Sequence, residues 1–154
     1  MANRPVLVAL LAAGLTGCDA VYSVRREASV PVMPAADAVL AAVRGAPGVD
    51  SAAYVPDGFT GRPVPADSAI TVTWGGAAGA AAFVEFVRTP GGARYEQHAS
   101  YLHGPAPQRE IDAAYPVMRA VEARLEAVPG LAGLGRAATQ ACSGEIRCPP
   151  AAPR

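Results

Sequence analysis

The sequence lacks lysine altogether and carries no excess of either charge. All 13 basic residues are arginine, and 13 acidic residues balance them. Because the arginines form no long run, we interpret the missing lysine as a composition bias rather than as chemistry. A near-neutral chain offers no electrostatic basis for binding nucleic acid or for binding of a polybasic segment to anionic lipid. Neither kind of contact is expected from charge.

Glycine-rich phosphate-binding signatures are also missing. The small-residue run at 75–80 reads Gly-Gly-Ala-Ala-Gly-Ala. It has neither the Gly-x-Gly-x-x-Gly spacing of dinucleotide sites nor the Gly-x-x-x-x-Gly-Lys-Ser/Thr spacing of phosphate loops. We therefore interpret it as the connection between two strands of a hairpin. The sequence predicts no cofactor.

Long apolar runs are missing as well, but a short one lies near the start of the chain. Arg4 precedes an uncharged apolar run at 6–13, and small residues then precede Cys18. The run is shorter than the roughly 20 apolar residues that span a bilayer. A positive start, a short apolar run and a small-residue cleavage site are typical of a secretory signal. Residues 1–17 are therefore expected to be a signal peptide.

The last residues of this leader, Leu15-Thr16-Gly17-Cys18, resemble the lipobox of bacterial lipoproteins. The resemblance implies cleavage before Cys18 and attachment of more than one acyl chain, palmitate among them, to that cysteine. Two or more acyl chains hold a protein firmly on a membrane. We therefore expect a protein of the cell envelope, anchored to the inner or outer membrane and facing the periplasm. Cleavage elsewhere, after Ala12-Ala13-Gly14, is the alternative.

Cysteine is scarce, with three residues in the chain. Once Cys18 is assigned to the lipid, Cys142 and Cys148 remain, and an even remainder in an oxidising compartment predicts a disulfide. Their spacing is wider than the Cys-x-x-Cys of thiol redox sites. A zinc site that joins both cysteines to His98 and His103 is the alternative, disfavoured by the same spacing. We expect a structural disulfide and no metal.

The chain divides into four expected segments. These are a signal peptide at 1–17, a lipidated N-terminus and tether at 18–33, a single α+β domain at 34–148 and a disordered tail at 149–154. Residues 21–24 are expected to form either a short strand or part of the tether. Arg25-Arg26-Glu27 is expected to be solvated, and the stretch at 28–34, with its two prolines, to be an extended connector.

The domain is expected to contain two helices, near 35–44 and 107–128. In the second helix, residues at helical spacing form an apolar stripe, while Arg119 and Glu122 lie mostly opposite, where they can pair. Pro116 either kinks this helix or marks its start. Strands are expected at 49–55, 70–74, 83–88, 93–102 and, at one edge, 136–141. This order predicts a two-layer α+β sandwich, with an antiparallel sheet of about four strands and both helices on one face.

Pairing of Arg88 with Ala93 would separate the two faces of this sheet cleanly. One face then carries the apolar side chains, and the other carries Glu85, Glu96, His98 and Ser100. A carboxylate, an imidazole and a hydroxyl suggest a nucleophilic triad. Residues two apart on a strand, however, lie about 6.6 Å apart, beyond the roughly 2.6–3.2 Å that a nucleophile and its base need. No nucleophile elbow surrounds Ser100, so we interpret this group as a solvated outer face.

Two functional hypotheses follow from these patterns. The favoured one is a membrane-anchored, non-catalytic binding, scaffold or inhibitor module that meets an envelope protein partner. Its basis is the lipobox together with the missing catalytic motifs. The alternative is a small periplasmic hydrolase that uses His98 with Glu96 or Glu85. Such a site would need a pocket, which the flat face of a sheet seldom provides.

Overall fold

The computed structural model describes residues 21–56, 64–65, 67–76, 81–102 and 106–150. These residues form an antiparallel sheet of six strands in the order β2-β3-β4-β5-β1-β6. Strands β2 and β6 are the two edges. The strands are β1 (Val21–Val30), β2 (Val49–Tyr54), β3 (Ala69–Gly76), β4 (Ala81–Thr89), β5 (Gly92–Leu102) and β6 (Thr139–Ser143).

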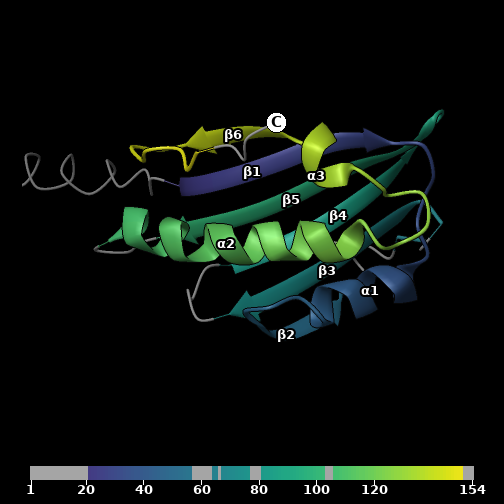
Figure 1. Ribbon diagram of the computed structural model, residues 1–154, viewed down its shortest axis with the longest axis horizontal. Helices are drawn as coiled ribbons and strands as arrows, with labels where there is room; N and C mark the ends of the chain where they lie inside the picture. The colour runs from purple at the N-terminus through teal and green to yellow at the C-terminus, as the bar shows by residue number, and fades with distance from the viewer. Residues whose placement is uncertain (1–20, 57–63, 66, 77–80, 103–105, 151–154) are drawn as a thin grey trace, which may run out of the picture.

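The helices pack over one face of this sheet (Figure 1). They are α1 (Ala36–Arg44), α2 (Pro107–Leu125) and the short α3 (Leu134–Ala137). The mixed α+β class predicted from the sequence is therefore confirmed, although the sheet has six strands instead of about four. None of the helices in the described ranges has the length and apolar character needed to cross a bilayer.

The core lies between the helices and the sheet. Arg88 pairs with Ala93, as the hydrophobic pattern predicts. This register turns Phe86 and Tyr95 toward the helices, where both are fully buried and their ring centroids lie 5.4 Å apart. The stripe predicted for the second helix is buried too: Ile111, Ala114, Met118, Val121, Leu125 and Val128.

The largest difference from the sequence-based expectation concerns residues 21–30. They form β1, an interior strand between β5 and β6, where a short strand or tether at 21–24, a solvated stretch at 25–27 and an extended connector were expected. Arg26, expected to be solvated, is 3% exposed. Side chains alternate along a strand, so Arg26 occupies an inward position between Val24 and Ala28. A charged residue at that position interrupts the apolar alternation by which a strand is recognised.

Two details of the C-terminal half also differ from expectation. Helix α2 runs unbroken from Pro107 with the exposed Pro116 inside it, so the helix does not start at Pro116. The expected edge strand at 136–141 is confirmed as β6, but it begins at Thr139 because residues 134–137 form α3. In the expected disordered tail, Pro149 is buried and its carbonyl accepts a hydrogen bond from Gln140 Nε2 at 2.6 Å. Residues 151–154 lie outside the described part.

Candidate functional site

The outer face of the sheet, away from the helices, carries the residues that the sequence singled out. Glu96, His98 and Ser100 alternate along β5, and each is half-buried. The register sets Glu85 of β4 opposite Glu96 and sets Phe83 opposite His98. The predicted residues therefore share one face.

These residues do not form a catalytic triad. Within the described ranges, no hydrogen bond joins Glu96, His98 and Ser100. The His98 ring instead meets the ring of Phe83 edge-on, at a centroid distance of 5.2 Å. Burial lowers the pKa of His98 from 6.5, and the nearby Glu96 carboxylate opposes part of that change. The imidazole is thus a neutral, half-buried packing partner that lacks the hydrogen-bonded nucleophile a base requires.

Three carboxylates lie in one row across the outer face. The pairing of β1, β5 and β4 aligns Glu27, Glu96 and Glu85. Glu27 lies 3.7 Å from the Arg25 guanidinium at the surface, and Glu85 accepts a hydrogen bond from Thr71 at 3.2 Å. Among the described residues, no group of three or more histidines, cysteines or acids is arranged to hold a metal ion. The row is a polar surface.

The helix-covered face contains a buried ion pair that the sequence patterns did not predict. Arg26 of β1 donates from Nε to Glu122 Oε1 at 2.5 Å, and Glu122 is fully buried. Arg119, one turn earlier on α2, donates to the other oxygen of Glu122. Burial raises the pKa of Glu122, and the two guanidinium groups oppose that rise. The expectation that Glu122 lies on the exposed side of its helix is therefore wrong, although its pairing with Arg119 is confirmed.

The Arg26 guanidinium connects four elements. Besides Glu122 of α2, its Nη2 donates to the carbonyl of Gly135 in α3 at 2.9 Å, and its Nη1 donates to Gln140 Oε1 in β6 at 3.1 Å. Tyr115 of α2 donates to the same Gln140 oxygen at 2.6 Å. A buried charge is tolerated when hydrogen bonds satisfy it in this way. The network thus fixes the C-terminal segment against the sheet.

Tyr95 and Gln97 of β5 extend this network. The Tyr95 hydroxyl lies 2.8 Å from Gln97 Oε1 and 3.4 Å from Glu122 Oε1, and burial raises the pKa of Tyr95. Gln97 is fully buried, yet its Nε2 has no partner, and the same holds for Trp74 Nε1. These two atoms are the unpartnered buried side-chain polar atoms of the described part.

A sequence signal for this pair exists, but it is weak. Glu122 follows Met118 by four residues and so lies on the buried side of α2. Arg26 continues the inward alternation of Val24, Ala28 and Val30 in β1. Charged residues are seldom fully buried unless they are paired. The positions of Arg26 and Glu122 therefore predict an ion pair only once β1 and α2 are known to pack against each other.

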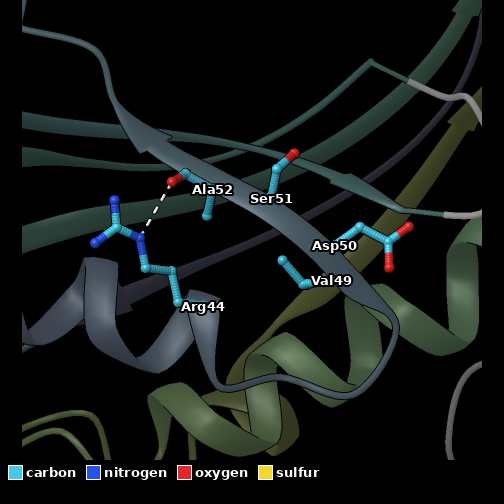
Figure 2. A pocket seen from close by; sticks show the side chains of 5 residues that line it. All are labelled: Arg44, Val49, Asp50, Ser51 and Ala52. Atoms are coloured by element: carbon cyan, nitrogen blue, oxygen red, sulfur yellow. Dashed lines mark hydrogen bonds between the residues drawn. The ribbon is translucent and has the colours of Figure 1, made fainter.

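A shallow hollow of about 350 Å³ lies beside the edge strand β2 (Figure 2). It is lined by Arg44 at the end of α1 and by Val49, Asp50, Ser51 and Ala52 of the strand. Arg44 Nε donates to the Ala52 carbonyl at 3.2 Å, as the dashed line in Figure 2 marks. An edge strand exposes unpaired backbone groups, and a charged side chain placed on them limits pairing with other chains. We interpret Arg44 as protection of this edge.

The predicted disulfide is present. Cys142 of β6 and Cys148 are joined with an S–S distance of 2.09 Å. Because their sulfurs are bonded to each other, they cannot ligate zinc together with His98. His103, the other histidine of that alternative, and Cys18, the predicted lipidation site, both lie outside the described residues.

Comparison with known proteins gives no information about the function of this chain. No protein-family model matches the chain, and no curated protein matches it. One solved structure that resembles it is the crystal structure of protein MLL2253 from Mesorhizobium loti. That likeness has a TM-score of 0.37 at 17% sequence identity, over 68% of this chain and 93% of that one. At this level it supports no argument about function.

Proposed function

We propose that this protein is a lipoprotein of the bacterial cell envelope, anchored by acyl chains on Cys18, whose folded body is a non-catalytic binding, scaffold or inhibitor module. The observation that carries the proposal is the leader at 1–17, with Leu15-Thr16-Gly17 directly before Cys18. The disulfide is consistent with an oxidising compartment. The anchor would lie in the inner or outer membrane, with the body in the periplasm.

The non-catalytic part of the proposal draws on how the ionisable side chains are used. Arg26 and Glu122 are buried in a network that joins structural elements, and His98 packs against Phe83. In the described part of the chain, the helices cover one face of the sheet, and the opposite face is the broad surface that we propose for a partner (Figure 1). Half-buried Phe83 and Val87 on that face supply apolar contact area among charged neighbours.

The anchor is tested by mass analysis of the protein purified from bacterial membranes. The expected N-terminus is an acylated Cys18, and the expected product lacks residues 1–17. A Cys18→Ser variant should lose the acyl mass and partition into the aqueous phase after detergent extraction. Recovery of the native protein with residues 1–17 attached, or with Cys18 unmodified, would overturn the anchor.

The binding role is tested by affinity capture of the lipidated protein from its own envelope in mild detergent. A reproducible protein partner is expected. Val87→Lys, which places a charge on the outer face, should weaken its recovery, whereas Asp112→Lys on the exposed side of α2 should not. Recovery of bulk lipid alone, or loss of the partner with Asp112→Lys only, would contradict a partner surface on the outer face.

The hydrolase alternative has less support. His98 and Glu96 have no hydrogen bond to each other among the described contacts, and the hollow beside β2 lies away from both. An assay of the wild-type and His98→Gln proteins against ester and peptide substrates decides the matter. We expect no turnover from either protein. Turnover that His98→Gln abolishes would revive the hydrolase.

A further inference from the structure

The start of β1 limits how far the folded body can lie from a lipid on Cys18. Val21 is the first residue of β1 and follows Cys18 by three residues. Consecutive Cα atoms are 3.80 Å apart, so the Cα atoms of these two residues lie within about 11 Å of each other. Covalent geometry therefore leaves no room for the long tether that was expected at 18–33.

Val21 belongs to a rigid part of the molecule. It pairs with Leu102 of β5, and two residues later Ser23 pairs with Ser143 of β6. The Ser23 and Ser143 hydroxyl oxygens are 2.6 Å apart. A strand held on both sides cannot swing independently of its sheet, so the direction of the anchor is coupled to the orientation of the whole body.

The elements around Val21 form one end of the molecule, which we call the anchor end. It consists of the start of β1, the end of β5, the first turn of α2 and the disulfide loop at 143–148, and the described elements gather at the left of Figure 1. Gln108 of α2 joins the loop through two hydrogen bonds. Its Nε2 donates to the Arg147 carbonyl at 3.0 Å, and the Arg147 amide donates to its Oε1 at 2.6 Å.

The surface of the anchor end is polar and balanced in charge. Arg109 has a side chain that is 80% exposed, and Arg147 is exposed, while Glu110 follows Arg109 directly and Glu145 precedes Arg147 by two residues. The exposed large hydrophobic residue of the described part, Val32, follows β1 at the opposite end. The anchor end therefore suits contact with lipid headgroups, without insertion into the acyl layer and without a need for anionic lipid.

We propose that the anchor end lies against the headgroup layer of the membrane and that the strands stand upright on it. This inference rests on the proposed acylation of Cys18. Strand β1 has 10 residues, so its far end stands about 30 Å from its start. The turn between β4 and β5 therefore points away from the bilayer. The outer face of the sheet and the β2 edge then face sideways, where a neighbouring envelope protein can reach them.

Fluorescence quenching by phosphatidylcholine that carries a nitroxide on its headgroup tests this orientation in the mature, lipidated protein. The single tryptophan is first replaced by Trp74→Phe, and a reporter is then placed at either end. Arg109→Trp reports on the anchor end. Gly91→Trp reports on the far turn, where a Cβ would meet nothing within 4 Å. Arg147→Trp provides a second reporter at the anchor end in case Arg109→Trp perturbs α2.

In vesicles that contain phosphatidylcholine with a nitroxide on its headgroup, the reporters at Arg109 and Arg147 should fluoresce about twofold less than in unlabelled vesicles, because quencher and reporter then lie at the same depth, outside the roughly 30 Å hydrocarbon core. Gly91→Trp should change little. The difference should persist in 1 M salt, where exposed charges are screened beyond about 3 Å. Vesicle flotation, measured on the same samples, reports separately on the anchor.

The outcomes distinguish the two proposals. Protein that floats with the vesicles while the Gly91→Trp reporter is quenched as much as the Arg109→Trp reporter overturns the orientation and leaves the anchor in place. Protein that floats with neither reporter quenched also overturns the orientation and leaves the anchor in place, because the body would then stand away from the bilayer. Protein that does not float overturns the anchor, and the orientation with it.

Discussion

Arg25 and Arg26 are neighbours in the sequence and have opposite environments. The side chain of Arg25 is 45% exposed on the outer face and lies 3.7 Å from Glu27. Arg26 is 3% exposed and bonded to Glu122, Gly135 and Gln140. Exposed ion pairs contribute little to stability, whereas removing one partner of a buried pair leaves an uncompensated charge. The two residues therefore form a matched comparison.

Arg26→Ala should lower the free energy of unfolding by about 3–5 kcal/mol, because Glu122 would stay buried with only part of its compensation. Arg25→Ala should change it by less than about 0.5 kcal/mol. Urea denaturation of the oxidised protein at pH 7 measures both. Equal effects of the two substitutions would contradict the assignment of Arg26 as a buried connecting residue.

His98 gives the stability a pH dependence at the residue scale. Burial lowers the pKa of His98 in the folded state below the 6.5 of an unfolded chain. The unfolded chain therefore binds more protons as the pH falls below 6.5, and the folded state loses stability over that range. In His98→Gln this loss should be smaller. The urea midpoints of the wild-type and His98→Gln proteins, measured between pH 5 and 8, test this prediction. If the two midpoints change with pH in parallel, His98 has the same pKa in the folded and unfolded states.

Glu122 changes the pH dependence of stability in the direction opposite to His98, so it is tested with a separate variant. Burial raises its pKa in the folded state above 4.5. Folding is therefore helped by proton binding at acid pH, and this contribution is lost as the pH rises through the folded-state pKa. Comparison of the wild-type protein with Glu122→Gln below pH 6 separates this effect from that of His98.

At the scale of elements, strands β3, β4 and β5 and the stripe of α2 were predictable because local patterns specify them. Alternation at 70–74 and helical spacing from Ile111 to Leu125 are visible without knowledge of the neighbours. β1 was not predictable in the same way. Its inward Arg26 becomes compatible with a core only through Glu122, 96 residues later. Long-range pairing of this kind leaves no local pattern.

The same reasoning applies to the candidate site. The shared face of Glu85, Glu96, His98 and Ser100 follows from period-two alternation and was predicted. The Phe83–His98 ring contact and the carboxylate row depend on the register between strands and on the position of β1. The buried network of Arg26 and Glu122 depends on which helix covers which strand. Sequence patterns therefore placed the outer face and missed the inner network.

The disulfide stabilises the edge strand β6. The bond closes a short loop between Cys142 and Cys148, and the loop-entropy relation gives about 2 kcal/mol for a ring of this size. The double variant Cys142→Ser with Cys148→Ser should lose about that amount. Hydrogen exchange should increase first in the amides of β6, because β6 is an edge strand that is hydrogen-bonded to the sheet on one side, through β1. Faster exchange in β3 than in β6 would contradict this order.

Helix α2 tolerates Pro116 because that residue faces solvent. Proline inside a helix removes one backbone hydrogen bond, here the bond to the Asp112 carbonyl, and costs up to about 3 kcal/mol. Pro116→Ala should therefore raise the free energy of unfolding by about 1–3 kcal/mol. Ala123→Pro, at another exposed position of α2, is the matched control and should lower it by about 3 kcal/mol. Thermal and urea denaturation measure both, and destabilisation by Pro116→Ala would show that the proline is needed.

At the scale of the whole molecule, the first described strand has its partners far along the chain. β1 pairs with β5 and with β6, as in the pairs Val21 with Leu102 and Ser23 with Ser143. Contacts between distant parts of the sequence slow folding, because the chain loses loop entropy before the contacts form. Val24 and Arg26 cannot be buried until the C-terminal third of the polypeptide has been synthesised. A nascent chain that is still incomplete therefore stays unfolded at its N-terminal end, which is the state that the export proposed for this chain requires.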